Sequence, residues 1–167
     1  MADQNSTAAE GQQAAQQFNI QRIYVKDLSF ESPRTPELFA TGGAKPEIKL
    51  ELNTQNRKIG EHQYEVVLQL TLTAAHAEDH LFLIEVQQAG LFHIQVANNN
   101  ELGRALGSFC PNLLFPYARE LIDSLTTRGG FPPLMLAPVN FDALYAEAIR
   151  RRQAEGGEWP PRRGRRS

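Results

Sequence analysis

The sequence predicts an α+β fold in which a four-stranded antiparallel sheet carries two C-terminal helices on one face. Apolar and polar residues alternate in four segments between residues 18 and 96, and apolar residues recur at helical spacing beyond residue 100. The connections between the alternating segments lack the long crossovers that join parallel strands, so antiparallel pairing is predicted. Strands that precede helices in this way are typical of α+β domains.

The first predicted strand spans residues 18–30, where the alternation is nearly regular. One parity of this segment holds Phe18, Ile20, Tyr24, Leu28 and Phe30, and the other holds Ile23, Val25, Asp27 and Glu31. Residues 31–46 contain three prolines and two glycines, which predict a loop.

Three further strands are predicted from the same alternation. The second spans residues 47–53 and is followed by a turn region at residues 55–62. The third spans residues 63–74, and its inward side chains are predicted to be Tyr64, Val66, Leu68, Leu70 and Leu72. The fourth spans residues 80–96, where Gly90 predicts a bulge or a bend.

Two helices are predicted after the strands. Pro116 must lie near the start of the first helix or kink it. The pair at 129–130 is a glycine stop signal. Asn140 is a favourable N-cap for the second helix, which ends among arginines at 150–152. The apolar stripe of the first helix comprises Leu113, Leu114, Tyr117, Leu121, Ile122 and Leu125.

Composition and length favour one globular domain. The 167 residues are 41% hydrophobic and 22% charged, and no apolar run reaches the ~18–20 residues that cross a bilayer. The first residues lack the basic start and apolar run of a signal peptide. The single cysteine excludes a disulfide within the chain and fits a reducing cytoplasm, and the four scattered histidines argue against a structural metal site.

Charge is unevenly distributed along the chain. Residues 1–149 have a net charge of −7, whereas residues 150–167 carry seven arginines and two glutamates. We therefore divide the chain into a disordered polar tail at 1–17, a domain at 18–152 and a flexible basic tail at 153–167.

Catalytic signatures are missing from the sequence. It contains no phosphate-binding loop, dinucleotide fingerprint, zinc-protease motif or nucleophile elbow. Cys110 is expected to be a small buried hydrophobe at a helix start, and His76 and His80 to belong to a polar turn. We therefore expect no enzyme and no cofactor.

The segment 129–145 is unusually apolar for a region with three prolines. It can cover the core of its own domain, insert into a membrane, or line a peptide groove on a stiff frame. Membrane insertion more often uses a basic amphipathic helix, and the flanks here are not basic. Composition alone leaves the core and the groove open.

Four segments together resemble the family of the bacterial export chaperone SecB. They are FNIQRIYVKDLSFESP, YEVVLQLTLTA, FLIEVQQAGLF and the long CPNLLFPYARELIDSLTTRGGFPPLMLAPVNFDALY. The resemblance implies a homotetramer, a dimer of dimers, of four-stranded, two-helix protomers. It also implies a cytosolic holdase without ATPase activity that keeps precursors unfolded and delivers them to the SecA motor.

The resemblance assigns three sets of residues. Docking of SecA is implied for Asp27, Glu31, Leu83 and Glu85. The client groove is implied for Ile48, Leu50, Leu52, Phe131, Leu134, Met135, Leu136, Phe141, Leu144, Tyr145 and Ile149. The first predicted helix supplies a tetramer contact or packs on the sheet, through Leu114, Tyr117, Leu121 and Leu125.

Two departures from the family pattern are visible. The C-terminal tail is rich in arginine where the family tail is acidic, and the loop at 31–46 lacks the tryptophan often found there. The expected partners are unfolded precursors, SecA and further copies of the chain, without specific nucleic acid or integral membrane association. The alternative is a general or antitoxin-linked stress chaperone of the same fold that lacks targeting to SecA. A small-molecule enzyme on this scaffold is a third, weaker possibility.

Overall fold

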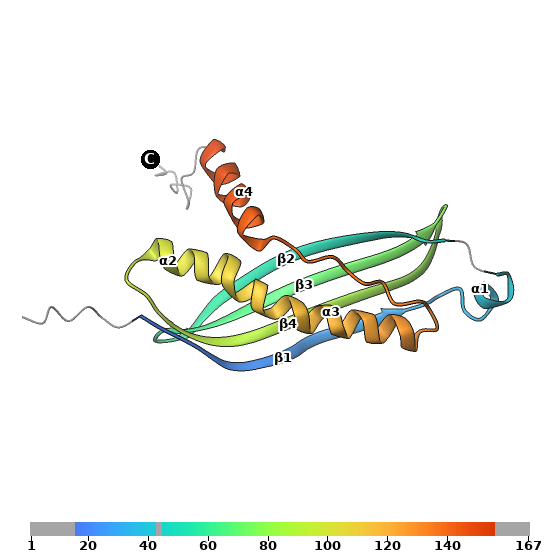
Figure 1. Cartoon of the computed structure of the whole chain (residues 1–167), viewed down its shortest axis with the longest axis horizontal. Coiled ribbons are helices and arrows are strands. Elements are labelled where there is room, and N and C mark those ends of the chain that lie inside the picture. The colour runs from blue at the N-terminus through green and yellow to red at the C-terminus, as the bar shows by residue number, and fades with distance from the viewer. Residues whose placement is uncertain (1–15, 43–44, 156–167) are drawn as a thin grey trace, which may run out of the picture.

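The computed structural model describes residues 16–42 and 45–155 of the chain. Its sheet has the strand order β1-β4-β3-β2, and every neighbouring pair is antiparallel, which confirms the predicted α+β class (Figure 1). The elements are β1 (Gln17–Glu31), α1 (Glu37–Ala40), β2 (Glu47–Gly60), β3 (Gln63–His76), β4 (Asp79–Gln95), α2 (Asn99–Arg104), the π-helical turn η1 (Ala105–Phe109), α3 (Cys110–Arg128) and α4 (Phe141–Ala154).

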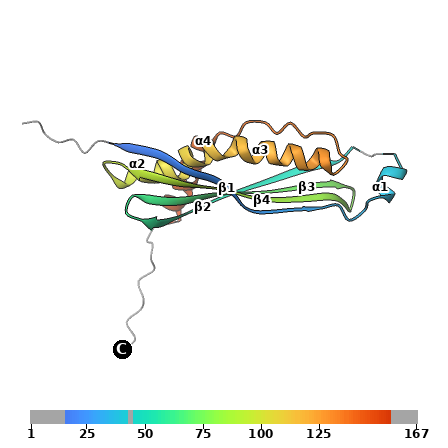
Figure 2. The same ribbon diagram turned by 90° about the horizontal axis from the view of Figure 1, so that it is seen from below.

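The domain has two layers, because α3 and the segment that follows it lie on one face of the sheet (Figure 2). We call this the helix face, and on β4 it carries Ile84, Val86 and Phe92. The opposite, open face carries Leu83, Glu85 and Gln87 on the same strand. The core lies between the sheet and α3, where Leu114 and Ile122 are fully buried against the strands. In the described part of the chain, no helix is both long and apolar enough to span a membrane.

Strand β1 departs from the predicted alternation at two bulges. The pairing with β4 shifts by one residue between Ile20 and Arg22, and again between Val25 and Asp27. Each extra residue reverses the side on which the following side chains lie. The predicted parities are therefore wrong in the middle of the strand: Ile23 and Val25 lie on the helix face, and Tyr24 lies on the open face. Asp27 and Glu31 do share a face, as predicted.

Strand β2 is longer than its alternation indicates. Residues 55–60, predicted as a turn, continue the ladder with β3, and Arg57 pairs with Glu65. The turn itself is only two residues long, and His62 adopts a left-handed φ of 56° there. The alternation did not predict a strand at residues 55–58 because polar side chains lie on both of its faces. An edge strand tolerates them, since solvent satisfies their hydrogen bonds.

Gly90 does not form a bulge in β4, which pairs without a shift at this residue on the β3 side. The glycine instead allows α3 to approach the sheet closely. A Cβ atom at Gly90 would lie 2.6 Å from the ring of Phe92 and 3.1 Å from the side chain of Leu114. The physical reason for the glycine is therefore close packing rather than backbone conformation.

Helix α3 contains Pro116 in its interior and ends where the glycine pair predicts. Gly130 has a left-handed φ of 85°, and its amide donates to the carbonyl of Thr127. The amide of Phe131 donates to the carbonyl of Thr126, which completes a Schellman motif. This motif fixes the direction in which the apolar segment leaves the helix.

We expect Gly90→Ala to lower the free energy of unfolding by ~1–3 kcal/mol, because the added methyl group has no space between Phe92 and Leu114. Gly60→Ala is the matched control, since its Cβ would meet only the flexible end of Gln63 at 3.3 Å. Urea denaturation of both variants measures the difference. Equal stabilities would contradict close packing at Gly90.

Candidate functional site

The apolar segment 131–140 runs back along α3 toward α4 (Figure 1). One cavity lies at each end of this segment, on the helix face. The first cavity, of about 570 Å³, lies where α3 ends and α1 packs. Only two of the predicted groove residues, Phe131 and Leu134, line it. The remaining wall comprises Leu38, Phe39, Lys45, Pro46, Leu81, Phe82, Gly130, Pro132 and Pro133.

Three phenylalanines from distant segments form the apolar wall of the first cavity. The ring of Phe131 lies 4.5 Å from that of Phe82 on β4 and 5.6 Å from that of Phe39 on α1. Phe39 lines the cavity and remains 52% exposed. Sequence reasoning missed Phe39, although an apolar pair within a loop rich in proline and glycine is the same signal that marked segment 129–145. The loop without tryptophan thus contributes an aromatic side chain after all.

The second cavity, of about 490 Å³, lies between β2, η1 and α4. Leu52 and four predicted residues of α4, Phe141, Leu144, Tyr145 and Ile149, line it. Arg152, Asn53 and Asn56 add polar groups to the same wall.

Helix α4 is held in place by its first two turns. The side chain of Asn140 caps the helix by accepting from the amide of Ala143 at 3.0 Å, as predicted. The Ser108 hydroxyl donates to Asp142 Oδ1 at 2.5 Å. The side chain of Tyr145 rests on Gly103 and Gly107: a Cβ atom at Gly103 would lie 2.7 Å from its hydroxyl oxygen, and one at Gly107 would lie 2.5 Å from its ring. These two glycines therefore form the surface against which α4 packs.

The other predicted groove residues, Met135, Leu136, Ile48 and Leu50, line neither cavity. Leu134 and Leu136 pack on the core, whereas Met135 between them is 81% exposed. Met135 has a left-handed φ of 50°, an unfavourable conformation for this residue that costs about 1–2 kcal/mol. Ile48 and Leu50 extend the helix face of β2 without lining either cavity.

Phe141 is less accessible than the groove prediction implies. Its side chain is buried in the core and its ring lies 5.8 Å from that of Phe115. It forms the floor of the second cavity rather than its rim.

The four residues predicted to dock SecA lie together on the open face. Register pairs Asp27 with Gln87, Glu31 with Leu83 and Ser29 with Glu85, and directly paired side chains share a face. Among the described residues, Asp27, Glu31 and Glu85 make no ion pair. This half of the open face is therefore acidic and available to a basic surface.

A buried carboxylate organises the other half of the open face. Glu65 on β3 has only 7% of its side chain exposed. Its Oε1 atom lies 2.8 Å from Lys26 Nζ and 3.0 Å from Arg57 Nε, and its Oε2 atom accepts from the Tyr24 hydroxyl. The side chains of Tyr24 and Lys26 reach from β1 across β4 to make these contacts. Ala89, the β4 residue that pairs with Tyr24, has a small side chain.

These contacts shift two pKa values in opposite directions. The hydrogen bonds from Lys26 and Tyr24 lower the pKa of Glu65 from 4.5 to about 2, despite its burial. Burial, and then the carboxylate of Glu65, raise the pKa of Tyr24 from 10.0 to about 12. Sequence reasoning assigned Glu65 no role, because Tyr24 and Lys26 come from β1, a strand that chain order does not bring next to β3.

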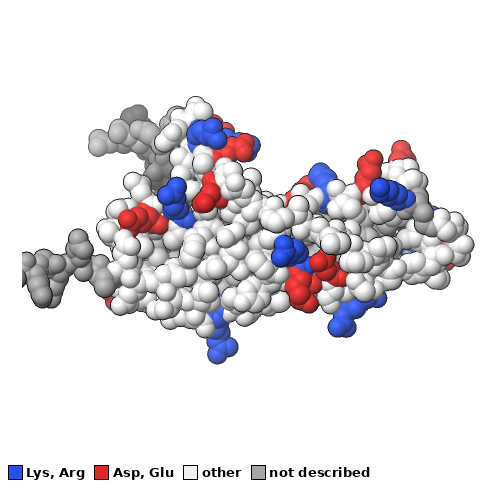
Figure 3. Space-filling model, viewed as in Figure 1, with Lys and Arg blue, Asp and Glu red and all other residues white. Residues whose placement is uncertain are grey.

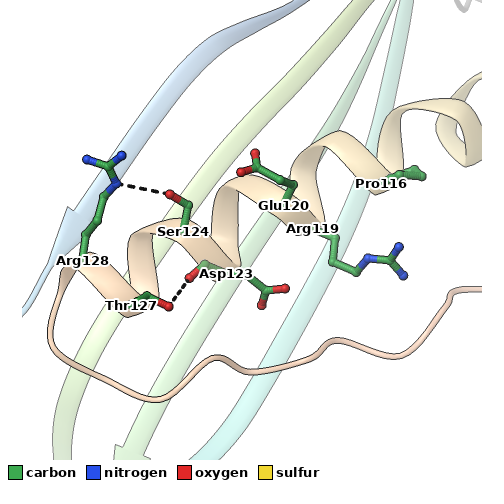
Figure 4. Close-up of a pocket in the computed structure, with 7 residues that line it drawn as sticks. All are labelled: Pro116, Arg119, Glu120, Asp123, Ser124, Thr127 and Arg128. Carbon is green, nitrogen blue, oxygen red and sulfur yellow. Dashed lines mark hydrogen bonds between the residues drawn. The ribbon is translucent and has the colours of Figure 1, made fainter.

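The outer surface of α3 carries a shallow polar hollow of about 630 Å³ (Figure 4). Its side chains bond along their own helix: Arg128 Nε donates to Ser124 Oγ, and the Thr127 hydroxyl donates to the Asp123 carbonyl. They do not converge on a common point, so the hollow is not built to hold a small molecule. The lining residues are Pro116, Arg119, Glu120, Asp123, Ser124, Thr127 and Arg128.

The structure places the four proposed tetramer residues differently from one another. Leu114 is fully buried against the sheet and is unavailable to a second copy. Leu121 and Leu125 are half-buried and pack on the core. Tyr117 is 52% exposed on the outer side of α3.

Reactive side chains do not gather in the described residues. Cys110 is buried, as predicted, and burial raises the pKa of its thiol to about 12, so the nucleophilic thiolate is scarce at neutral pH. No group of three His, Cys, Asp or Glu residues is placed to hold a metal ion in the described part of the chain.

Comparison with known proteins decides the family. The model of the family described as preprotein translocase subunit SecB matches residues 11–152. The chain belongs to the SecB family. It is 56% identical over 138 residues to the Protein-export protein SecB of Hahella chejuensis, covering 83% of this chain and 86% of that one. It is 52% identical over 160 residues to that of Pseudomonas fluorescens strain Pf0-1, covering 96% and 98%.

Membership in the SecB family makes the chain a protein-export chaperone and not an enzyme. A solved structure of the same fold is a SecB-like chaperone of Mycobacterium tuberculosis in complex with a peptide from the HigA1 antitoxin. It has a TM-score of 0.60 and 20% identity, and the match covers 73% of this chain and 87% of that one. At that identity the likeness concerns the fold alone.

The depressed pKa of Glu65 predicts how the stability of this SecB-family protein depends on pH. A carboxylate with a folded pKa near 2 and an ordinary value of 4.5 contributes stability that is fully present above about pH 4.5 and is lost as pH falls toward 2. The shift corresponds to roughly 3 kcal/mol. We expect the stability gap between the unsubstituted chain and Glu65→Gln to be constant near neutral pH and to narrow below about pH 4.5.

Urea denaturation between pH 7 and pH 3, at one fixed protein concentration, measures this gap. Glu61→Gln is the control, because its side chain is 90% exposed, and we expect it to change stability little. A gap for Glu65→Gln that stays the same at every pH would exclude the depressed pKa as its source.

Proposed function

We propose that the chain is a cytoplasmic holdase that binds unfolded precursors in the two cavities and the segment between them. The observation that carries the proposal is the pair of apolar cavities joined by a proline-stiffened segment on one face. Charged side chains are few and scattered over this face (Figure 3). An extended chain of mixed sequence can place apolar side chains in both cavities without a defined binding motif.

The stiffness of the segment favours affinity. Pro132, Pro133 and Pro138 restrict its backbone, so little conformational entropy is lost when a client binds. Each apolar client side chain that becomes fully buried contributes ~1.5–3 kcal/mol before ordering costs. Met135 is flexible and exposed, which suits clients of varied shape.

Assembly into a homotetramer, a dimer of dimers, would multiply these contacts. Strand β1 is an edge strand that exposes Ile20, Val25 and Leu28, and α3 exposes Tyr117 on its outer side. Such surfaces favour contact with further copies of the chain. Several linked grooves then hold one long client by avidity, although a single groove is weak.

Delivery to SecA is proposed to use the acidic half of the open face. Glu31 lies directly beside Leu83, and Glu85 and then Asp27 follow along the same face, so a basic partner meets an apolar contact at one end of a negative row. Clustered charges of this kind raise association rates and make them sensitive to salt. The antitoxin-linked alternative gains no support beyond the fold, because the relatives at 52–56% identity are named protein-export proteins.

We expect Phe39→Ser combined with Leu144→Ser to weaken client binding, because one side chain lies at each cavity. Both are about half exposed, so the fold should tolerate the change. The measurement is the delay in refolding of a slow-folding precursor without nucleotide. Ile59→Ser is the control, since Ile59 is also 46% exposed and lines neither cavity. An undiminished delay in the double variant would show that the cavities are not the client site.

We expect Glu85→Lys, or Asp27→Lys with Glu31→Lys, to lower the affinity for SecA steeply at low salt and less at high salt. Client binding should be unchanged, because the cavities open on the other face of the sheet. Glu61→Lys makes the same charge change at the far end of the sheet and should affect SecA little. Titration of SecA against each variant measures the effect, and unaltered affinity after charge reversal would rule out docking here.

A further inference from the structure

Lys26 is the cation closest in sequence to the proposed SecA-docking acids. It is the extra residue of the second bulge in β1, between Val25 and Asp27. The bulge places Lys26 and Asp27 on the open face as immediate neighbours, because Lys26 reaches Glu65 on that face and Asp27 pairs with Gln87 there. An unrestrained ammonium at this position would have the Asp27 carboxylate within its reach.

Glu65 draws that ammonium in a different direction. Glu65 pairs with Leu91 on β4, and Asp27 pairs with Gln87 on the same strand. Leu91 and Gln87 are four residues apart. The positions of Glu65 and Asp27 are therefore ~13 Å apart along the strand direction. Lys26 Nζ lies 2.8 Å from Glu65 Oε1, and Asp27 makes no ion pair within the described residues.

We propose that Glu65 is a positioning residue for partner docking: it holds the Lys26 ammonium away from Asp27, so that the acidic face keeps its charge for a basic partner. This inference rests on the proposed docking of SecA. Glu65 itself is buried beneath Tyr24, Lys26 and Arg57 and does not reach a partner.

The side chain of Lys26 does not determine which face of the sheet the other β1 side chains occupy. Ile23 precedes the bulge and Phe30 follows it, and both pack on the core. The ring of Phe30 also stacks on Phe82 at 6.1 Å. Because packing fixes both sides of the bulge, Asp27 stays on the open face when Lys26 is replaced, and the two charges can be varied separately.

The test measures SecA affinity at ~0.05 M and ~0.5 M salt for Glu65→Gln, Lys26→Met and the double variant. We expect Glu65→Gln to weaken docking about 3-fold to 5-fold at low salt, with the deficit largely lost at high salt. Lys26→Met should dock within about twofold of the unsubstituted chain. The double variant should regain that affinity even though it is less stable, because the released ammonium is gone.

A purely structural role for Glu65 gives the opposite result, since the double variant would then dock as weakly as Glu65→Gln. That outcome would overturn the proposal, as would a deficit that persists at high salt. Arg57→Met with Glu65→Gln is the matched control. Arg57 lies three strands and four residues from Asp27, about 20 Å away, so its removal should not restore docking.

Two further comparisons separate the possible failures. If Asp27→Lys leaves affinity unchanged, the docking proposal itself fails. If Asp27→Lys weakens docking and Glu65→Gln does not, only the positioning role fails. Should Glu65→Gln alone not fold, Lys26→Met is compared with the double variant, and a difference of more than about twofold would overturn the positioning role.

Discussion

The structure depends on one constraint: only one face of the four-stranded sheet is covered by helices in the described part of the chain. The pattern in which each strand alternates its side chains between the two faces therefore decides which side chains lie on the helix face and which lie on the open face. The second bulge in β1 adjusts this pattern, so that Ile23 and Phe30 both reach the core although they lie seven positions apart, a spacing that puts residues of a regular strand on opposite faces. The second bulge also turns Asp27 and Glu31 to the open face. A strand without it would turn both carboxylates to the helix face, among the apolar side chains of β1.

The same constraint explains the composition of segment 131–140. A regular helix there would have covered the sheet and left no surface for another chain. Proline prevents that, and the Schellman motif at Gly130 directs the segment back along α3. Leu134 and Leu136 attach it to the core, while Met135 points outward. The segment therefore covers part of the core, one of the interpretations that composition left open, and it also frames two cavities, which the proposed client groove requires.

Local signals in the sequence were sufficient for most of the elements. Alternation located β3 and β4 to within two residues, and the glycine pair and Asn140 marked the helix ends correctly. The bulges in β1 escaped prediction because an inserted residue leaves no mark on a segment that is mixed on both faces. Phe39 and Glu65 escaped for a different reason. Their roles arise from contacts with Phe131 and with Tyr24 and Lys26, more than 35 residues away in sequence, which only the strand order β1-β4-β3-β2 brings together.

Placing the two proposed surfaces on opposite faces of a sheet has a consequence for how they act together. A client on the helix face and a motor on the open face are separated by a single sheet. They nevertheless contact different side chains of every strand, because successive residues alternate between the two faces. Binding at one face need not displace anything at the other. The most direct connection between the two surfaces is β4, where Phe82, which lines the first cavity, is followed by Leu83 on the open face. Strand β1 adds a second connection, since Phe30 stacks on Phe82 and its neighbour Glu31 lies beside Leu83 on the open face.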